Sequence, residues 1–318
     1  MDSLHRYLVL LLFFTLTGCV HVTDIALPQT PSTARQPGVV EIVAKGMQFE
    51  APAEVPAGWN TFRFFNDSAM VHFALLEKMP PGTGLIEQQE QVAPAFQEGM
   101  DLLNAGKQEA AMKAFGKLPA WFADVEFFGG AGLVSPGNVA ETTVYLEPGT
   151  YLIECYVKTG GIFHSFNPSP ALYGMVAEFT VVPNDSRRAP PKADWTLSVS
   201  GVEGIRFEKP PMSGRQVVEV YFADQQVHEN FVGHDVHLLR FAEDTDIASL
   251  VSWMDWRSPK GLDTPAPAEF VGGVNEMAAG SRAYLHLNLV PGRYAWIAEV
   301  PNAAGKKLLR EFSIPSEQ

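Results

Sequence analysis

The segment ETTVYLEPGTYLIECYV, residues 141–157, contains two runs of β-branched and aromatic residues separated by a Pro-Gly turn. Side chains alternate between the two faces of a strand, so Tyr151, Ile153 and Cys155 of the second run share one face. Such runs, bounded by turn residues, are typical of β-strands. The segment therefore predicts two strands joined by a turn, the second of which carries a cysteine.

The same order of strand-like segments occurs twice along the chain. KGMQFEAP (45–52) matches EGIRFEKP (203–210), and FFGGAGLVSPGNVAETTVYLEPGTY (127–151) matches FVGGVNEMAAGSRAYLHLNLVPGRY (270–294). AEFTV (177–181) likewise matches REFSI (310–314). We interpret this as tandem duplication of one β-domain, with domains at 38–183 and 194–318 joined by a hydrophilic linker at 184–193.

Only the insertions between these strands have a helical pattern. Residues 93–118 carry two apolar stripes around a central Asn-Ala-Gly, which predicts a pair of short helices. Residues 245–256 occupy the equivalent place in the second half and begin with Thr245 and Asp246, both good helix caps. The predicted fold class is therefore all-β, with short helical insertions.

The N-terminus is typical of an exported protein. Residues 1–18 combine a short charged start with an apolar run that is too short for a membrane helix, which predicts a signal peptide. Leu16-Thr17-Gly18-Cys19 resembles the lipobox of bacterial lipoproteins, which implies cleavage before Cys19 and acylation of that residue. Val20 in place of Asp implies the outer membrane. Residues 19–37, rich in Pro, Thr and Gln, are interpreted as a tether. The alternative is an ordinary signal peptide with an incidental cysteine.

The composition narrows the function further. The 318 residues carry a net charge of −13, so a nucleic-acid partner is not expected, whereas a basic protein partner is compatible with this charge. The chain has two cysteines. If Cys19 is acylated, Cys155 has no partner for an intramolecular disulfide in an oxidising compartment. Cys155 is then either a buried, inert thiol or a metal ligand.

These residues together resemble the cupredoxins, the plastocyanin-like Greek-key β-sandwich proteins. The likeness lies in QFEAPAEVPAGWNTFRFFNDSAMVHF (48–73), in the Pro-Gly-Thr-Tyr turn before Cys155, and in the closing strand GMVAEFTV (174–181). It implies two tandem sandwiches and one type 1 copper, held by His72, Cys155, His164 and the axial Met175. A thiolate, two imidazoles and a weak thioether suit both oxidation states of copper.

The sequence departs from the family pattern in its ligand loop. Eight residues separate Cys155 from His164, and ten separate His164 from Met175, where cupredoxins have only a few in each gap. The segment SFNPSPALY (165–173) is interpreted as an insertion that folds aside, because a longer loop costs little additional chain entropy. The alternative is that Cys155, His164 and Met175 are unrelated core residues.

The second half lacks the complete ligand set. Ala298 stands at the position of the cysteine, and no histidine follows it. His237 aligns with His72, while His228 and His234 lie just upstream. We therefore expect no thiolate copper site there; a histidine-only site and a solvated His-rich turn remain the two alternatives.

The resulting prediction is a cell-envelope lipoprotein, periplasm-facing and anchored to the outer membrane. It would bind one type 1-like copper for electron transfer or copper handling, with a redox protein as partner. No enzyme activity is expected, because the sequence has neither a His-Cys-His run nor the additional histidines that copper enzymes of this fold use. The alternative function is a metal-free interaction or assembly scaffold.

Overall fold

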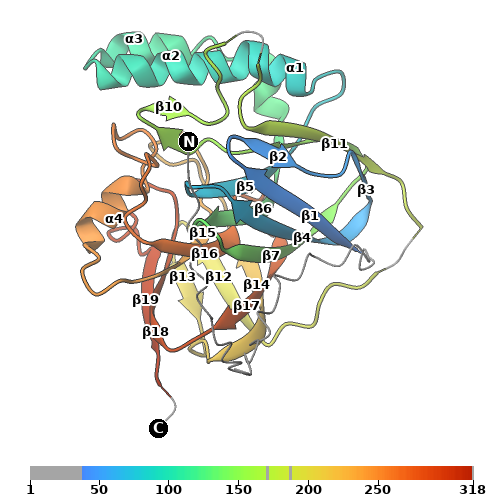
Figure 1. The fold of residues 1–318 in the computed structure, drawn as a ribbon, viewed down its shortest axis with the longest axis vertical. Coiled ribbons are helices and arrows are strands. Elements are labelled where there is room, and N and C mark those ends of the chain that lie inside the picture. The colour runs from blue at the N-terminus through green and yellow to red at the C-terminus, as the bar shows by residue number, and fades with distance from the viewer. Residues whose placement is uncertain (1–37, 170–171, 186–187, 317–318) are drawn as a thin grey trace, which may run out of the picture. The chain divides into compact units, whose positions relative to one another are not determined.

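The structure is a computed structural model that describes residues 38–169, 172–185 and 188–316 (Figure 1). One sheet contains β1 (Val39–Lys45), β2 (Gln48–Glu50), β4 (Gly58–Asp67), β7 (Val139–Leu146), β12 (Trp195–Ser200), β13 (Gly204–Phe207), β14 (Gly214–Phe222) and β17 (Arg282–Leu289). Within the described ranges its strand order is β13-β12-β14-β17-β7-β4-β1-β2. Burial alternates along β4, where Phe62 and Phe64 face the core, as expected for strands with one buried face.

The second large sheet comes from the remaining long strands. Its members are β3 (Glu54–Pro56), β5 (His72–Lys78), β6 (Glu126–Val134), β8 (Gly149–Glu154), β11 (Val176–Val182), β15 (Val236–Arg240), β16 (Glu269–Val274), β18 (Gly292–Ile297) and β19 (Leu309–Ile314). Over the same described ranges the order is β19-β18-β15-β16-β6-β5-β8-β11-β3. β9 (Lys158–Thr159) and β10 (Ile162–Phe163) pair with each other in a separate small hairpin.

The two strand orders show how the duplicated halves are joined. In each sheet, the strands of one half lie in the mirror-image order of their equivalents in the other half. The exception is β3, an extra strand at one edge. The halves meet where β7 pairs antiparallel with β17 and where β6 pairs antiparallel with β16, and each of these strands faces its own sequence equivalent. Equivalent surfaces that pair with each other are typical of a two-fold relationship. The duplication predicted from sequence is therefore present strand for strand.

The core lies between the two sheets in both halves. Phe62 of β4 contacts Phe179 of β11 across the sandwich, with ring centroids 6.3 Å apart. In the second half Trp195 of β12 contacts Trp296 of β18 at 6.4 Å. The predicted all-β class with tandem sandwiches is confirmed, while the domain limits at 38–183 and 194–318 stay a prediction.

The helices of the described residues are α1 (Leu85–Glu87), the π-helical turn η1 (Gln88–Val92), α2 (Ala93–Asn104), α3 (Gln108–Phe115), the 3-10 helix η2 (Ala120–Asp124) and α4 (Ile247–Trp253). Three of them, α2, α3 and α4, lie in the predicted insertions, while α1, η1 and η2 flank the first insertion. Gly106, at φ +71°, makes the turn between α2 and α3. The Asp246 carboxylate caps α4 by accepting from the backbone N–H groups of Ala248 and Ser249. The helix pair of the first insertion and the helix of the second are both confirmed.

The β9–β10 hairpin lies between α2 and a loop of the second half (Figure 1). Lys158 of this hairpin is fully buried, and its Nζ donates to the carbonyls of Trp256 at 2.8 Å and Ser258 at 3.0 Å. Its backbone N–H donates to Leu262 O at 2.7 Å. Burial lowers the pKa of Lys158 to about 8, although the nearby carboxyl groups of Asp263 and Asp255 act to raise it. This lysine therefore connects the segment after Cys155 to the second half of the chain.

Replacing Lys158 by Met should lower the free energy of unfolding by about 2 kcal/mol, because two buried carbonyl groups lose their donor. Urea unfolding monitored by circular dichroism measures this change. The matched control is Lys113→Met, which removes an exposed lysine paired only with Glu109 and should change stability by less than about 0.5 kcal/mol. Equal stability of the two variants would contradict the structural role of Lys158.

Candidate metal centre

His72 is the first residue of β5 and is placed by the loop that precedes it. Asn66 Nδ2 donates to the carbonyls of Met70 and Val134, both at 2.7 Å, and Ser68 Oγ donates to Asn66 Oδ1 at 2.7 Å. Asn and Ser side chains often fold such loops through bonds to nearby backbone. The loop therefore has a fixed conformation that delivers His72 into the interior, where it is fully buried.

Cys155 follows the last residue of β8 and is also fully buried. Its backbone N–H donates to Met175 O at 3.2 Å, which continues the pairing of β8 with β11. Its side chain points into the sandwich, as the alternation of the strand predicted.

His164 is brought to the same place by two backbone hydrogen bonds. Its N–H donates to Val157 O at 2.7 Å, and its carbonyl accepts from Met175 N at 2.6 Å. The first bond closes the gap between Cys155 and His164, and the second closes the gap between His164 and Met175. Residues 158–163 form the β9–β10 hairpin outside the first bond. That the insertion at 165–173 folds aside stays a prediction, because part of it lies outside the described residues.

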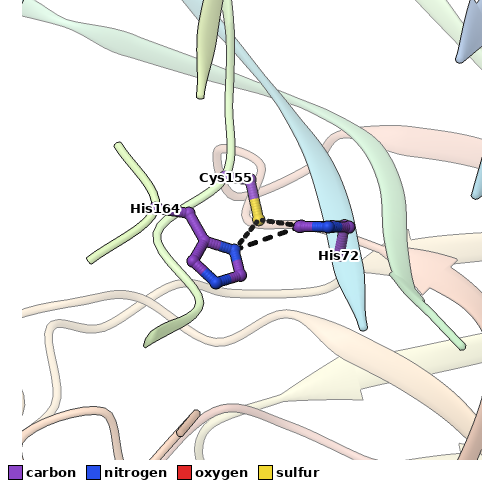
Figure 2. Close-up of side chains that lie close together, drawn as sticks. All are labelled: His72, Cys155 and His164. Atoms are coloured by element: carbon purple, nitrogen blue, oxygen red, sulfur yellow. Dashed lines mark hydrogen bonds between the residues drawn. The ribbon is translucent and has the colours of Figure 1, made fainter. Parts of the chain in front are cut away.

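The three predicted side chains converge on one point (Figure 2). Cys155 Sγ lies 3.5 Å from His72 Nδ1 and 3.8 Å from His164 Nδ1, and the two Nδ1 atoms are 3.1 Å apart. The other nitrogen of His164, Nε2, lies 2.9 Å from Thr159 Oγ1, which itself donates to Met70 Sδ at 3.1 Å. Thr159 therefore accepts from Nε2–H, which leaves the Nδ1 lone pair directed at the sulfur.

This arrangement suits a bound cation. The Nδ1 atoms of His72 and His164 and the sulfur of Cys155 face a common centre. Two neutral imidazoles with their lone pairs 3.1 Å apart repel each other unless a proton or a metal ion lies between them. The two-imidazole, one-thiolate set is that of a type 1 copper site.

Burial controls the protonation of this group. It lowers the pKa of His72 to about 4, an effect partly offset by the Gly46 backbone, and it lowers the pKa of His164 to about 3, with His72 adding to the shift. Burial raises the pKa of the Cys155 thiol to about 12, although backbone hydrogen bonds from Phe73 and Val157 act to lower it. Both imidazoles are thus neutral at pH 7 and ready to bind, while a metal ion must displace the thiol proton.

Met175 is fully buried and joined through its backbone to both Cys155 and His164. Together with His164 it lines an open hollow of about 750 Å³, whose other lining residues include Met47, Met70 and Tyr173. The backbone of the predicted axial ligand therefore lies beside Cys155 and His164. Cys19, the predicted acylation site, lies outside the described residues.

The equivalent position of the second half is closed by hydrogen bonds. His237 Nδ1 accepts from Leu133 N at 3.0 Å, and its Nε2 donates to Asp235 Oδ2 at 2.6 Å, so neither nitrogen has a free lone pair. Asp235 Oδ1 accepts from Glu299 N at 2.7 Å. Ala298 is fully buried where the first half has its cysteine. The expected absence of a thiolate ligand follows directly from Ala298.

Burial excludes one of the two alternatives for the second-half histidines. His228 Nε2 lies 3.4 Å from His234 Nδ1, and His234 Nε2 donates to Asp224 O at 2.9 Å. Both rings are buried, so the expectation of a solvated turn is wrong. The hydrophobic neighbours on β14 explain this, since Phe222 stacks on His234 at 6.4 Å.

Sequence reasoning missed the residues that hold the ligand loop. Gln97 Oε1 accepts from Phe163 N at 2.9 Å, next to His164. Gln89 Nε2 donates to Ser165 O at 2.9 Å, and its Oε1 accepts from Gly174 N at 2.6 Å, next to Met175. An apolar stripe predicts the helical insertion, but no periodicity shows that its glutamines reach a loop far along the chain.

Comparisons with known proteins complete the description of the site. No family model matches the chain, and no curated protein matches it. Among solved structures, a reduced auracyanin from Roseiflexus castenholzii is similar over 46% of this chain and 98% of its own, with 25% identity and a TM-score of 0.27. A multicopper oxidase covers 87% of both chains at 14% identity and a TM-score of 0.22. A copper nitrite reductase from Nitrosomonas europaea covers 88% of this chain and 93% of its own at 12% identity and a TM-score of 0.23. The TM-scores are low, and the geometry of the site is the stronger observation.

Acid should destabilise the metal-free protein. The unfolded imidazoles take up protons near pH 6.5, whereas His72 and His164 in the folded chain stay neutral to about pH 4 and about pH 3. The unfolded state then binds more protons, so the free energy of unfolding falls as the pH falls through 6.5. The shift of His72 alone predicts a loss of about 3 kcal/mol between about pH 7 and about pH 4.

Urea unfolding across this pH range measures the loss. His72→Gln should lose less stability over the same range than the wild-type chain, because one of the two shifted groups is gone. Identical pH dependence in the two proteins would show that His72 does not titrate as its burial requires.

Proposed function

We propose that this chain is a cupredoxin-like, one-electron copper protein of the cell envelope. The observation that carries the proposal is the convergence of Cys155 Sγ with the Nδ1 atoms of His72 and His164 inside the first sandwich. Bound there, copper would supply a couple that gains or loses one electron without forming or breaking bonds.

The residues around the site hold its ligands in place. Asn66 and Ser68 fix the loop before His72, Thr159 fixes the ring of His164, and the backbone bonds of His164 fix both loops. Ligands held this way keep their positions when the charge of the site changes. Small rearrangement favours rapid electron exchange, and this property supports electron transfer over copper storage.

Burial supports a non-catalytic role. His72 and Cys155 are fully buried, and His164 is 1% exposed. Among the candidate ligands, His164 and Met175 line the open hollow. Electron transfer needs no opening to a buried centre, whereas a substrate would need one. The net charge of −13 favours a basic protein as redox partner.

We further propose that a lipid on Cys19 anchors the protein to the outer membrane, facing the periplasm. Support comes from the apolar run and the Leu-Thr-Gly-Cys sequence at 16–19, followed by Val20. None of the helices in the described part of the chain combines the length and the apolar character that crossing a bilayer requires.

One equivalent of cupric ion should produce an intense visible band from the thiolate-to-copper transition. Cys155→Ser should abolish the band, because the thiolate is its source, and Met175→Leu should keep it while changing the reduction potential, because the axial ligand is weak. The control His286→Gln alters a histidine of β17 that bonds Thr143 and should leave the band unchanged. Failure of the wild-type chain to take up copper would favour the metal-free scaffold.

Cys19→Ala should move the protein from the membrane fraction to the soluble fraction, since acylation needs this cysteine. Immunoblotting of separated fractions measures the distribution, and Cys155→Ala, which removes the other cysteine, is the matched control. Membrane association that survives the Cys19 substitution would argue against a lipid anchor.

A further inference from the structure

A second enclosed space lies beside the metal centre, under the helical insertion. It is a cavity of about 80 Å³ between η1, α2 and the nine-stranded sheet. Three glutamates line it: Glu77 of β5, Glu154 of β8, and Glu276, which follows β16. Both halves of the chain therefore contribute to its walls. None of these carboxyl groups belongs to a candidate copper ligand.

Glu77 is the most unusual of the three. Its residue is 6% exposed, and its carboxyl group has no hydrogen bond or ion pair with any described residue. Glu154 Oε2 accepts from Gln88 Nε2 at 2.5 Å, and Glu276 Oε2 accepts from Gly233 N at 2.8 Å. A buried carboxyl group without a partner is costly to retain unless a ligand supplies one.

The charges around the cavity are all of one sign. No lysine, arginine or histidine lies among its described lining residues. Burial, followed by the nearby Glu154 and Glu276, raises the pKa of Glu77 well above its ordinary range, and burial raises the pKa of Glu276 to about 7. A cation in the cavity would favour the ionised form of these carboxyl groups, because it supplies the opposite charge that their surroundings lack.

Aromatic residues form a large part of the remaining walls. Phe96, Phe122, Phe127, Tyr156 and Trp256 line the cavity, and Phe96 contacts both Phe122 and Trp256 with ring centroids 5.8 Å apart. Ring faces attract cations, most strongly where water is excluded. Aromatic walls offer no ligand atoms to a small hydrated metal ion.

The spacing of the glutamates also favours a cation larger than a metal ion. The side-chain clusters with ligand atoms all within 4.8 Å of one another, over the described residues, are His72–Cys155–His164 and Asp235–His237–Glu299. The three cavity glutamates do not form such a cluster. A cation with carbon atoms and several N–H groups can reach separated carboxylates while its alkyl part contacts the rings.

We propose that this cavity binds a small organic ammonium ion, with Glu77 as its main charged partner and the aromatic rings around its alkyl group. The cavity of about 80 Å³ is several times the roughly 10–15 Å³ that one water needs in this measure, so it has room for a small molecule. Methylammonium and ethylammonium have N–H groups that can donate to the Glu77 carboxylate, whereas tetramethylammonium has none. The site would be independent of copper binding.

Isothermal titration of the metal-free protein with methylammonium chloride, against a sodium chloride blank of equal ionic strength, tests the proposal. The wild-type chain should bind saturably, and Glu77→Gln should weaken binding by at least about tenfold, because a charge-assisted bond is lost. Glu126→Gln is the matched control, since it removes one negative charge from the exposed partner of Lys78 and should leave the affinity unchanged.

Tetramethylammonium provides a test that needs no variant, because it should give no saturable heat with the wild-type protein. The proposal is overturned if methylammonium does not saturate, if Glu77→Gln binds it as well as the wild type does, or if tetramethylammonium binds equally well. Saturable binding of Mn²⁺ that depends on Glu77, without methylammonium binding, would assign the cavity to a metal ion and would also overturn it. No outcome depends on the copper band, so the two proposals fail separately.

Discussion

The candidate site depends on two backbone hydrogen bonds made by one residue, His164. Its N–H closes the chain onto Val157 and its carbonyl onto Met175. These two bonds bring the backbones of Val157, His164 and Met175 together, although eight and ten residues separate the candidate ligands along the chain. The insertions add residues outside the site, and the entropic cost of closing a loop rises only slowly with its length.

The second half stabilises the site without contributing a ligand to it. Lys158, three residues after Cys155, is held by Trp256, Ser258 and Leu262 of the second half. Thr159, which orients His164, also lies 2.9 Å from Thr264 Oγ1. The second half, which has Ala298 in place of a cysteine, therefore still contributes contacts that support the site. Hydrogen bonds from Leu133 and to Asp235 occupy both ring nitrogens of His237 in this half.

Much of this could be predicted from the sequence, since strand alternation places Cys155 inward and the duplication is visible in matched segments. The four ligands could be named because they occur in the order that the resemblance requires. Other features depend on tertiary contacts that no local pattern encodes. Lys158 has the sequence context of a surface residue before a Gly-Gly turn, yet it is fully buried. Glu77, on a strand that is buried on both faces, gave no sign that it would line a cavity.

The anchoring of Lys158 also affects the order in which the chain can mature. All four candidate ligands precede residue 176, but the carbonyl groups that hold Lys158 belong to Trp256 and Ser258. A chain delivered N-terminus first exposes its thiol well before these partners arrive. The ligand loop acquires its final contacts only when the second half folds against it. A fragment ending at the linker would carry every candidate ligand but would lack the carbonyl groups that hold Lys158.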